Sequence, residues 1–213
     1  MAKTHLGLAK THRRSKPSAA ARRLIEAAKS LLDTRTPSEI TTKMLLDEAS
    51  VARNTLYLHF EDHTALLEIA LLEIFTGGVK EHLALLTESL SKATSKNDFM
   101  RRIGQVIEIS QDRKRRSFRI TRCRLIAHSD KNPRFSALLA NEQARINKSY
   151  MTFFIELRRR GWMGNNITPD VAAVVVQALT LGRVIDDVAA DRLPQAAWND
   201  AFMTIIKEVI LGR

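Results

Sequence analysis

Hydrophobic residues recur at steps of three and four along most of the chain, which is the spacing that gives an α-helix one apolar face. The first clear case lies within residues 19–34, where the residues that share a face are Leu24, Ile25, Ala28, Leu31 and Leu32. No segment alternates polar and apolar residues as a half-buried strand would. The pattern therefore predicts an all-α protein.

The polar and Gly- or Pro-containing segments between these runs divide the chain into about nine helices. The expected spans are 19–34, 42–49, 53–59, 61–90, 97–111, 113–128, 134–160, 169–190 and 195–211. Gly77 and Gly78 interrupt the fourth span, and we interpret the pair as a helix break rather than as a joint in a lever. We predict a basic flexible arm over residues 1–18, a small three-helix domain over 19–66 and a larger helical domain over 67–213.

The second and third spans have the pattern of a helix-turn-helix, which consists of two short helices joined by a tight turn. The turn is expected at Ser50 and Val51. Thr41 precedes the first short helix, where a threonine hydroxyl can accept a hydrogen bond from a backbone N–H group. Leu56 and Phe60 are placed to face inward and to hold the second short helix.

Three polar residues, Arg53, Asn54 and Thr55, open the second short helix. Side chains at that end of a recognition helix reach base edges in the major groove of DNA. Arg can bind the O6 and N7 atoms of guanine, and Asn can bind the N6 and N7 atoms of adenine. The segment therefore predicts sequence-specific binding to double-stranded DNA.

The charge of the chain agrees with a polyanionic partner. The formal net charge is +11, and residues 1–23 hold seven Lys and Arg residues and no acid. A basic balance favours nucleic acid or an anionic membrane surface. Arg13 or Arg14 could enter a minor groove, as flexible arms do, although a solvated tail without a role has the same composition.

Residues 23–67 resemble the DNA-binding domain of the TetR family of regulators. The resemblance rests on Ala27-Ala28 in the first helix, on Thr41, and on the run Thr55-Leu56-Tyr57-x-His59-Phe60. The rest of the chain matches such proteins only as a helical architecture. The alternative interpretation is that the aromatic run is only a packing cluster between helices.

The resemblance implies a role for each residue of this segment. The residues expected to contact DNA are Thr41, Thr42, Lys43, Arg53, Asn54, Thr55, Tyr57, His59 and His63. The middle three would read bases, and the others would bind the DNA backbone and fix the register. Three positions depart from the family pattern. Ser50 stands where the family usually has a turn glycine, Leu46 stands where it has a small residue, and His63 stands where it has a lysine.

A second basic cluster lies at residues 113–124, with Lys or Arg at 113, 114, 115, 116, 119, 122 and 124. On a helix these positions spread around the axis, so we interpret them as a solvated or interface-pairing helix. The alternatives are a site for an anionic effector, such as an acyl thioester or carboxylate, or an extra DNA contact. The candidate effector-binding residues are Phe99, Phe118, Arg122 and Cys123. Cys123 is otherwise expected to be a small buried hydrophobic residue.

The two helices expected at the C-terminal end, 169–190 and 195–211, are unusually apolar. The first is apolar on more than one face, and Ala172, Ala173 and Gly182 are small enough to allow close approach of a second helix. A monomer could not bury both faces, so we predict a homodimer through these two helices. The resemblance implies the same pair of helices in the same role.

The resemblance also implies a mechanism. The protein would be a transcriptional repressor, released from a palindromic operator when an unidentified small-molecule effector binds the helical body. The alternative is a DNA-binding protein of the same fold that a protein partner controls, or that organises DNA.

Several other classes are not expected. The sequence has no nucleophile-elbow motif, no phosphate-binding loop and no paired metal ligands, so we expect no enzyme, no cofactor and no metal site. Cys123 is the one cysteine, which excludes an internal disulfide. No apolar run is long enough to span a membrane, and no secretory signal is present. We therefore expect a cytoplasmic protein without a membrane partner.

Overall fold

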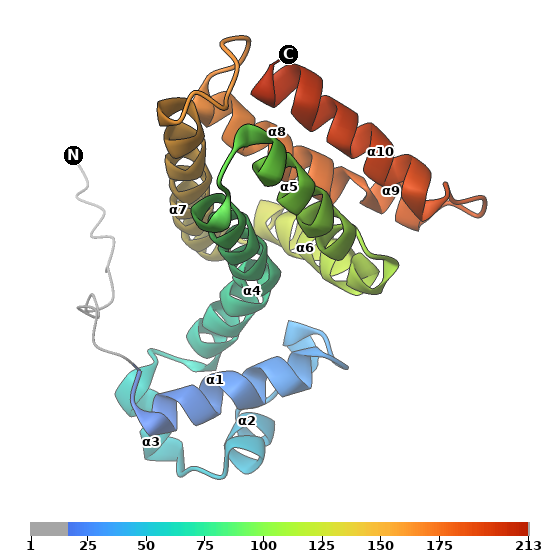
Figure 1. Cartoon of the computed structure of the whole chain (residues 1–213). Helices are drawn as coiled ribbons and strands as arrows, with labels where there is room; N and C mark the ends of the chain where they lie inside the picture. The colour runs from blue at the N-terminus through green and yellow to red at the C-terminus, as the bar shows by residue number, and fades with distance from the viewer. Residues whose placement is uncertain (1–16, 213) are drawn as a thin grey trace, which may run out of the picture. The chain divides into compact units, whose positions relative to one another are not determined.

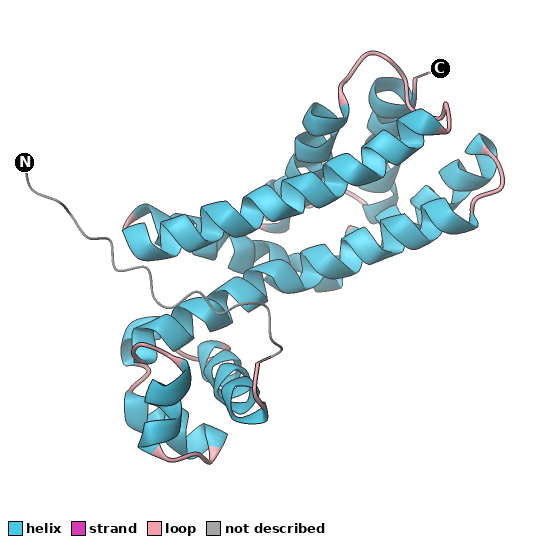
Figure 2. Ribbon diagram, turned by 90° about the vertical axis from the view of Figure 1, so that its left-hand side faces the viewer, coloured by secondary structure: helices cyan, strands magenta, loops and turns pink. Residues whose placement is uncertain are grey.

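The computed structural model describes residues 17–212 and divides into two compact units, with the boundary after Ile74. Within the described residues the chain consists of helices and connecting loops without a strand (Figure 2). The prediction of an all-α fold is therefore confirmed. The basic arm predicted over residues 1–18 lies outside the described residues except for Pro17 and Ser18.

The first unit contains α1 (Ala19–Leu32), the short turn η1 (Pro37–Glu39), α2 (Thr42–Ala49), α3 (Arg53–His59) and the beginning of α4 (His63–Lys92). Each of the four α-helices contributes a wholly buried leucine to one hydrophobic core, namely Leu24, Leu45, Leu56 and Leu66. These leucines lie on the apolar faces that the periodicity predicts. The short helices α2 and α3 are too short to be stable alone, so burial of these faces holds them in place.

The second unit contains the rest of α4 and the helices that follow it. These are α5 (Lys96–Ser110), η2 (Arg113–Arg115), α6 (Arg116–Asp130), α7 (Pro133–Arg159), α8 (Pro169–Gly182), α9 (Val184–Asp187), α10 (Gln195–Ile205) and the π-helical turn η3 (Ile206–Leu211). In this unit α7 packs along α8, α6 packs on α7 and α9, and α5 packs on α10 (Figure 1).

Polar side chains define several helix starts. At each of them a side-chain oxygen accepts a hydrogen bond from a backbone N–H group in the first turn, which contributes about 1 kcal/mol. The capping residues are Ser18 of α1, Thr41 of α2, Ser95 of α5 and Asn132 of α7. The predicted cap at Thr41 is therefore confirmed. Asp62 acts similarly at α4, where its carboxylate accepts from the N–H of Ala65 at 2.6 Å.

The interpretation of Gly77-Gly78 as a helix break is wrong, because α4 runs without interruption from His63 to Lys92. The physical reason is packing at Gly78, where a Cβ atom would lie 2.6 Å from the ring of Phe118 on α6. A glycine at this position lets the aromatic ring reach the helix backbone. Gly77 has open space around it and plays no such part.

Two other expected helices begin or end differently. The span predicted over 113–128 starts with η2, because the Asp112 side chain accepts from the N–H of Lys114 at 2.7 Å and holds a separate turn. The span predicted over 169–190 is divided into α8 and α9 at Arg183. That arginine is wholly buried and donates from Nη1 to the carbonyl oxygen of Gln111, so the break coincides with an inward-pointing polar side chain.

Candidate nucleic-acid interface

The turn between α2 and α3 is built on Ser50 and Val51. Ser50 has φ 51° and ψ 52°, which is the left-handed conformation that glycine adopts most easily. Its N–H donates to the carbonyl of Asp47 at 3.2 Å, and the N–H of Val51 donates to that of Leu46 at 3.1 Å. Val51 packs against the core of the first unit. Ser50 therefore makes the turn, at a cost of about 1 kcal/mol relative to glycine.

Burial of one face of α3 determines which side chains it presents to solvent. Leu56 and Phe60 are buried, as predicted, and they attach the helix to the core. Arg53 and Asn54 are exposed, and Tyr57 is 48% exposed. The Arg53 guanidinium lies 5.8 Å from the centre of the Tyr57 ring, so these two side chains share one exposed face. Thr55 is partly buried beside them.

The residues expected to contact the DNA backbone lie at three helix ends. Thr41 caps α2, with the N–H of Met44 donating to its Oγ1 at 3.3 Å, and its own hydroxyl hydrogen is still able to donate. Lys43 is exposed, and Thr42 is partly buried. His63 is partly buried in the first turn of α4.

His59 contacts a side chain from outside its own helix. Its Nε2 atom lies 3.0 Å from the hydroxyl oxygen of Ser18, the residue that caps α1. The contact joins the end of α3 to the start of α1. Ser18 is not among the predicted site residues. The sequence feature that could have identified it is its position directly before the first predicted helix.

Leu58 is a surface residue of α3 that is 77% exposed and for which the sequence patterns predict no role. It lies two positions after the buried Leu56, which places it on the opposite side of the helix. That spacing is the signal that could have identified it. An exposed leucine on a helix of this kind is suited to contact with an apolar group.

The four candidate effector-binding residues do not lie together. Phe99 lines a mostly apolar cavity of about 30 Å³, which has room for about one water molecule. Arg122 lines a separate open groove of about 500 Å³. Phe118 packs against Gly78. Cys123 is partly buried rather than buried, and it lines neither cavity.

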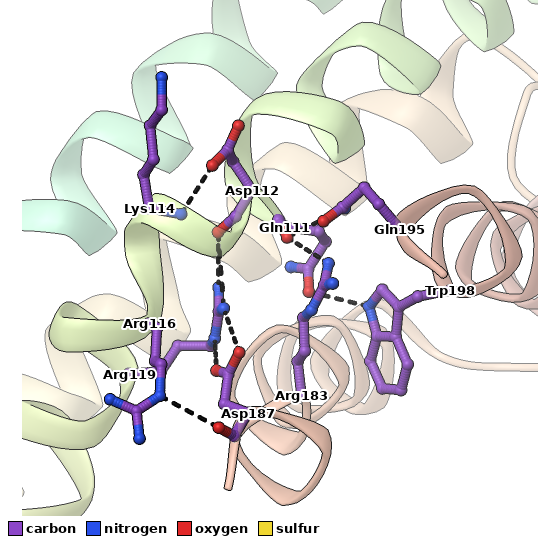
Figure 3. Close-up of polar contacts among 9 residues, drawn as sticks. All are labelled: Gln111, Asp112, Lys114, Arg116, Arg119, Arg183, Asp187, Gln195 and Trp198. Carbon is purple, nitrogen blue, oxygen red and sulfur yellow. Dashed lines mark hydrogen bonds and ion pairs between the residues drawn. The ribbon is translucent and has the colours of Figure 1, made fainter. Parts of the chain in front are cut away.

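The basic cluster at residues 113–124 is not simply solvated. Arg113, Lys114, Arg116 and Arg124 are exposed, but Arg119 and Arg122 are buried. Figure 3 shows that Arg119 faces Asp187 of α9, while Arg183 lies beside Gln111 and Trp198. The expectation of a solvated or interface-pairing helix is therefore wrong for these two arginines, which are buried within their own chain. The carboxylate that pairs with Arg119 lies 68 residues away, which is too distant in sequence to be predicted.

None of the helices in residues 17–212 is both long enough and apolar enough to cross a bilayer. Over the same residues, no group of three or more His, Cys, Asp or Glu side chains is arranged to hold a metal ion.

Comparisons with known proteins agree with this arrangement. Residues 24–70 match the family model described as bacterial regulatory proteins, tetR family, and these residues span α1 to the beginning of α4. No curated protein has a sequence that matches the chain.

The fold of the chain is similar to that of several solved regulators. GusR of Salmonella enterica has a TM-score of 0.67 and 19% identity over 92% of this chain and 98% of its own. NemR of E. coli, in its reduced form, has a TM-score of 0.65 and 14% identity over 91% of this chain and 99% of its own. A protein from Saccharomonospora viridis described as a transcriptional regulator, in complex with choline, has a TM-score of 0.62 and 18% identity over 92% and 100%.

The sequence match falls on the two short helices and the turn, and the likeness of fold extends over most of the chain. Residues 24–70 of the first unit are therefore similar to the tetR family of bacterial regulatory proteins, and the chain as a whole has the fold of the solved regulators.

Proposed function

We propose that the protein is a homodimeric transcription regulator that binds a palindromic DNA site through α3. The observation that carries the proposal is the exposed face of α3, on which Arg53, Asn54 and Tyr57 stand clear of the core while Leu56 is wholly buried behind them. A short helix fixed by its buried face and polar on the other is the form that enters a major groove.

The proposed contacts divide into two kinds. Base edges are read by Arg53, Asn54 and Thr55. The guanidinium group of arginine has two donors in the geometry that guanine requires, and the carboxamide group of asparagine has the donor and the acceptor that adenine requires. The backbone contacts fix the register without reading sequence, and they come from Thr41, Thr42, Lys43, Tyr57, His59 and His63. Leu58, which is exposed beside them, is placed to touch a thymine methyl group.

A dimer is supported by large apolar side chains left exposed at the C-terminal end of the chain. Val171 and Val174 of α8, Ile185 of α9, Val188, and Val209 of η3 are all at least 41% exposed. Exposed apolar side chains of this size mark an interaction surface where they lie on one face. Ala172 and Ala173, which were expected to let a partner helix approach, are instead buried within their own chain, so the valines take that part in the proposed interface.

Control by a small molecule is the form of regulation that we favour. The groove of about 500 Å³ in the second unit is large enough to hold a ligand, and the related fold from S. viridis is in complex with choline. A ligand that binds the DNA-free state 100-fold more tightly would shift the equilibrium by about 2.7 kcal/mol and release a repressor from its operator. Control by a protein partner is the alternative.

The proposal is tested by selecting DNA sites from a pool of random duplexes with the full-length protein, together with light scattering to obtain its mass. We expect an inverted repeat whose half-sites lie about 34–36 Å apart, and the mass of a dimer. Enrichment of no sequence, or of a single unrepeated half-site bound by a monomer, would contradict it.

A further inference from the structure

The groove in the second unit has a wall that is mostly apolar. It lies between α6, α7 and α8, and Phe75 of α4 also lines it. Ile126, Leu139 and Leu181 provide aliphatic surface along it. A groove of about 500 Å³ with this lining is suited to the hydrocarbon or ring of a small molecule.

The polar amides in the wall form hydrogen bonds with one another. Gln143 Nε2 donates to Asn147 Oδ1 at 2.8 Å and to Gln177 Oε1 at 2.9 Å. Gln177 Nε2 donates in turn to Asn147 Oδ1 at 3.0 Å and to the carbonyl of Ala173 at 2.7 Å. This network is neutral and joins α7 to α8, so it gives the groove shape rather than charge.

Arg122 is the charged residue among those that line the described groove. Its side chain comes from α6, it is 6% exposed, and its guanidinium carbon lies 4.4 Å from the centre of the Phe75 ring. Its Nε atom has no hydrogen-bond partner, and within residues 17–212 it forms no ion pair with a carboxylate. Burial lowers the pKa of this guanidinium.

A buried cation without an anion is costly to the folded protein, because desolvation is not offset by pairing. Burial alone would favour an apolar side chain at this position. The guanidinium fork matches the geometry of a carboxylate, with two parallel N–H donors. A ligand carboxylate would therefore supply the partner that the chain does not provide.

We propose that the groove binds an amphiphilic carboxylate, with its carboxylate on Arg122 and its apolar part against Phe75, Ile126 and Leu139. This inference rests on the proposed control by a small molecule and names the chemical class of that molecule. The single positive charge and the absence of an acid among the described lining residues select against a cation, and the apolar wall suits the hydrocarbon part of the ligand.

The test uses decanoate as the probe and full-length protein, with isothermal titration calorimetry as the readout. 1-Decanol and decylamine supply the same chain with no charge and with a positive charge. We expect decanoate to bind at least about 10-fold more tightly than 1-decanol, since a charge-assisted hydrogen bond contributes that much or more. Decylamine should bind more weakly still.

The variant Arg122→Met keeps an unbranched side chain and removes the charge. It should lose about 10- to 100-fold in decanoate affinity while its affinity for 1-decanol stays the same. Its unfolding midpoint without ligand should be equal to that of the parent or higher, because an unpartnered buried charge is removed. Arg122→Lys should be intermediate, since it keeps the charge and loses the fork. Arg124→Met is the matched control, an exposed arginine on the same helix, and should leave decanoate binding unchanged.

Equal binding of decanoate and 1-decanol to the parent protein would overturn the inference without any variant, and so would no binding of decanoate. Unchanged decanoate affinity in Arg122→Met would also overturn it. Binding of the selected operator is measured on the same samples. Loss of the carboxylate effect with intact operator binding refutes this inference alone, whereas failure to bind any operator refutes the proposed function and leaves the calorimetry unaffected.

Discussion

Arg119 of α6 and Asp187 of α9 form a buried ion pair with two parallel contacts. Nε lies 2.5 Å from Oδ2 and Nη2 lies 2.9 Å from Oδ1, while the two side chains are only 2% and 3% exposed. The same guanidinium is 3.4 Å from the carbonyl oxygen of Asp112, and Arg116 donates to the carbonyl oxygen of Asp187 at 3.0 Å (Figure 3). The pair therefore joins α6, α9 and the loop that follows α5.

Breaking this pair from one side should destabilise the second unit strongly. Asp187→Asn leaves the Arg119 guanidinium buried with an incomplete partner, and we expect a loss of about 3–5 kcal/mol in the free energy of unfolding. The double variant Arg119→Met, Asp187→Leu should be more stable than Asp187→Asn, because no charge remains to be buried. Urea denaturation followed by circular dichroism measures both. Glu88→Gln, which breaks the exposed pair with Lys92, is the control and should have far less effect. A comparably small effect of Asp187→Asn would show that the buried pair contributes little.

The adjacent glycines of α4 should respond in opposite ways to alanine. Gly77→Ala should stabilise the protein by about 0.5–1 kcal/mol, because the site is helical and has open space for a methyl group. Gly78→Ala should destabilise it by about 1–3 kcal/mol, because the methyl group would overlap the ring of Phe118. Thermal unfolding of the two variants gives the comparison. If both were stabilising, the contact between Phe118 and Gly78 would not be tight.

His82 should make the stability depend on pH. Burial, aided by the charge of Arg115, lowers the pKa of this histidine from 6.5 to about 4, and its Nδ1 lies 2.8 Å from the hydroxyl of Tyr150. In the folded protein it stays neutral below pH 6.5, while the unfolded chain takes up the proton, so stability is lost as the pH falls from about 6.5 towards 4. The full displacement corresponds to about 3 kcal/mol.

This dependence is measured by urea unfolding at pH 7.5, 6 and 5. His82→Gln should show a flatter profile over the same range, because glutamine does not titrate and can still bond to Tyr150. An identical slope in the parent and in His82→Gln would assign the acid sensitivity to other groups.

Much of the fold follows from local signals in the sequence. The periodicity predicts the apolar faces that bury Leu24, Leu45 and Leu56, and Thr41 marks the start of α2 because a cap acts over one turn. The exposed start of α3 also follows from the periodicity. Burial of Leu56 and Phe60 on one face of the helix leaves Arg53 exposed on another.

The second unit was less predictable because its decisive contacts join distant parts of the sequence. The partner of Arg119 lies 68 residues away, and nothing local to residues 113–124 distinguishes a buried arginine from a solvated one. Gly78 looks like a helix breaker until the ring of Phe118 is placed against it. The candidate effector residues were chosen for their residue type, and tertiary packing separates Phe99 from Arg122.

The most direct test of the central claim is fluorescence anisotropy with a labelled duplex that carries the selected inverted repeat, at physiological salt with excess competitor DNA. Arg53→Ala should weaken binding by about 1–3 kcal/mol and relax the preference for one base pair in each half-site. Tyr57→Phe should weaken binding to all duplexes similarly, because a phosphate contact carries no sequence information. Arg124→Met should change neither. Binding that is equally tight to a scrambled duplex, that is unaffected by Arg53→Ala and that disappears as salt rises would contradict the account and would leave only non-specific attraction between a basic protein and DNA.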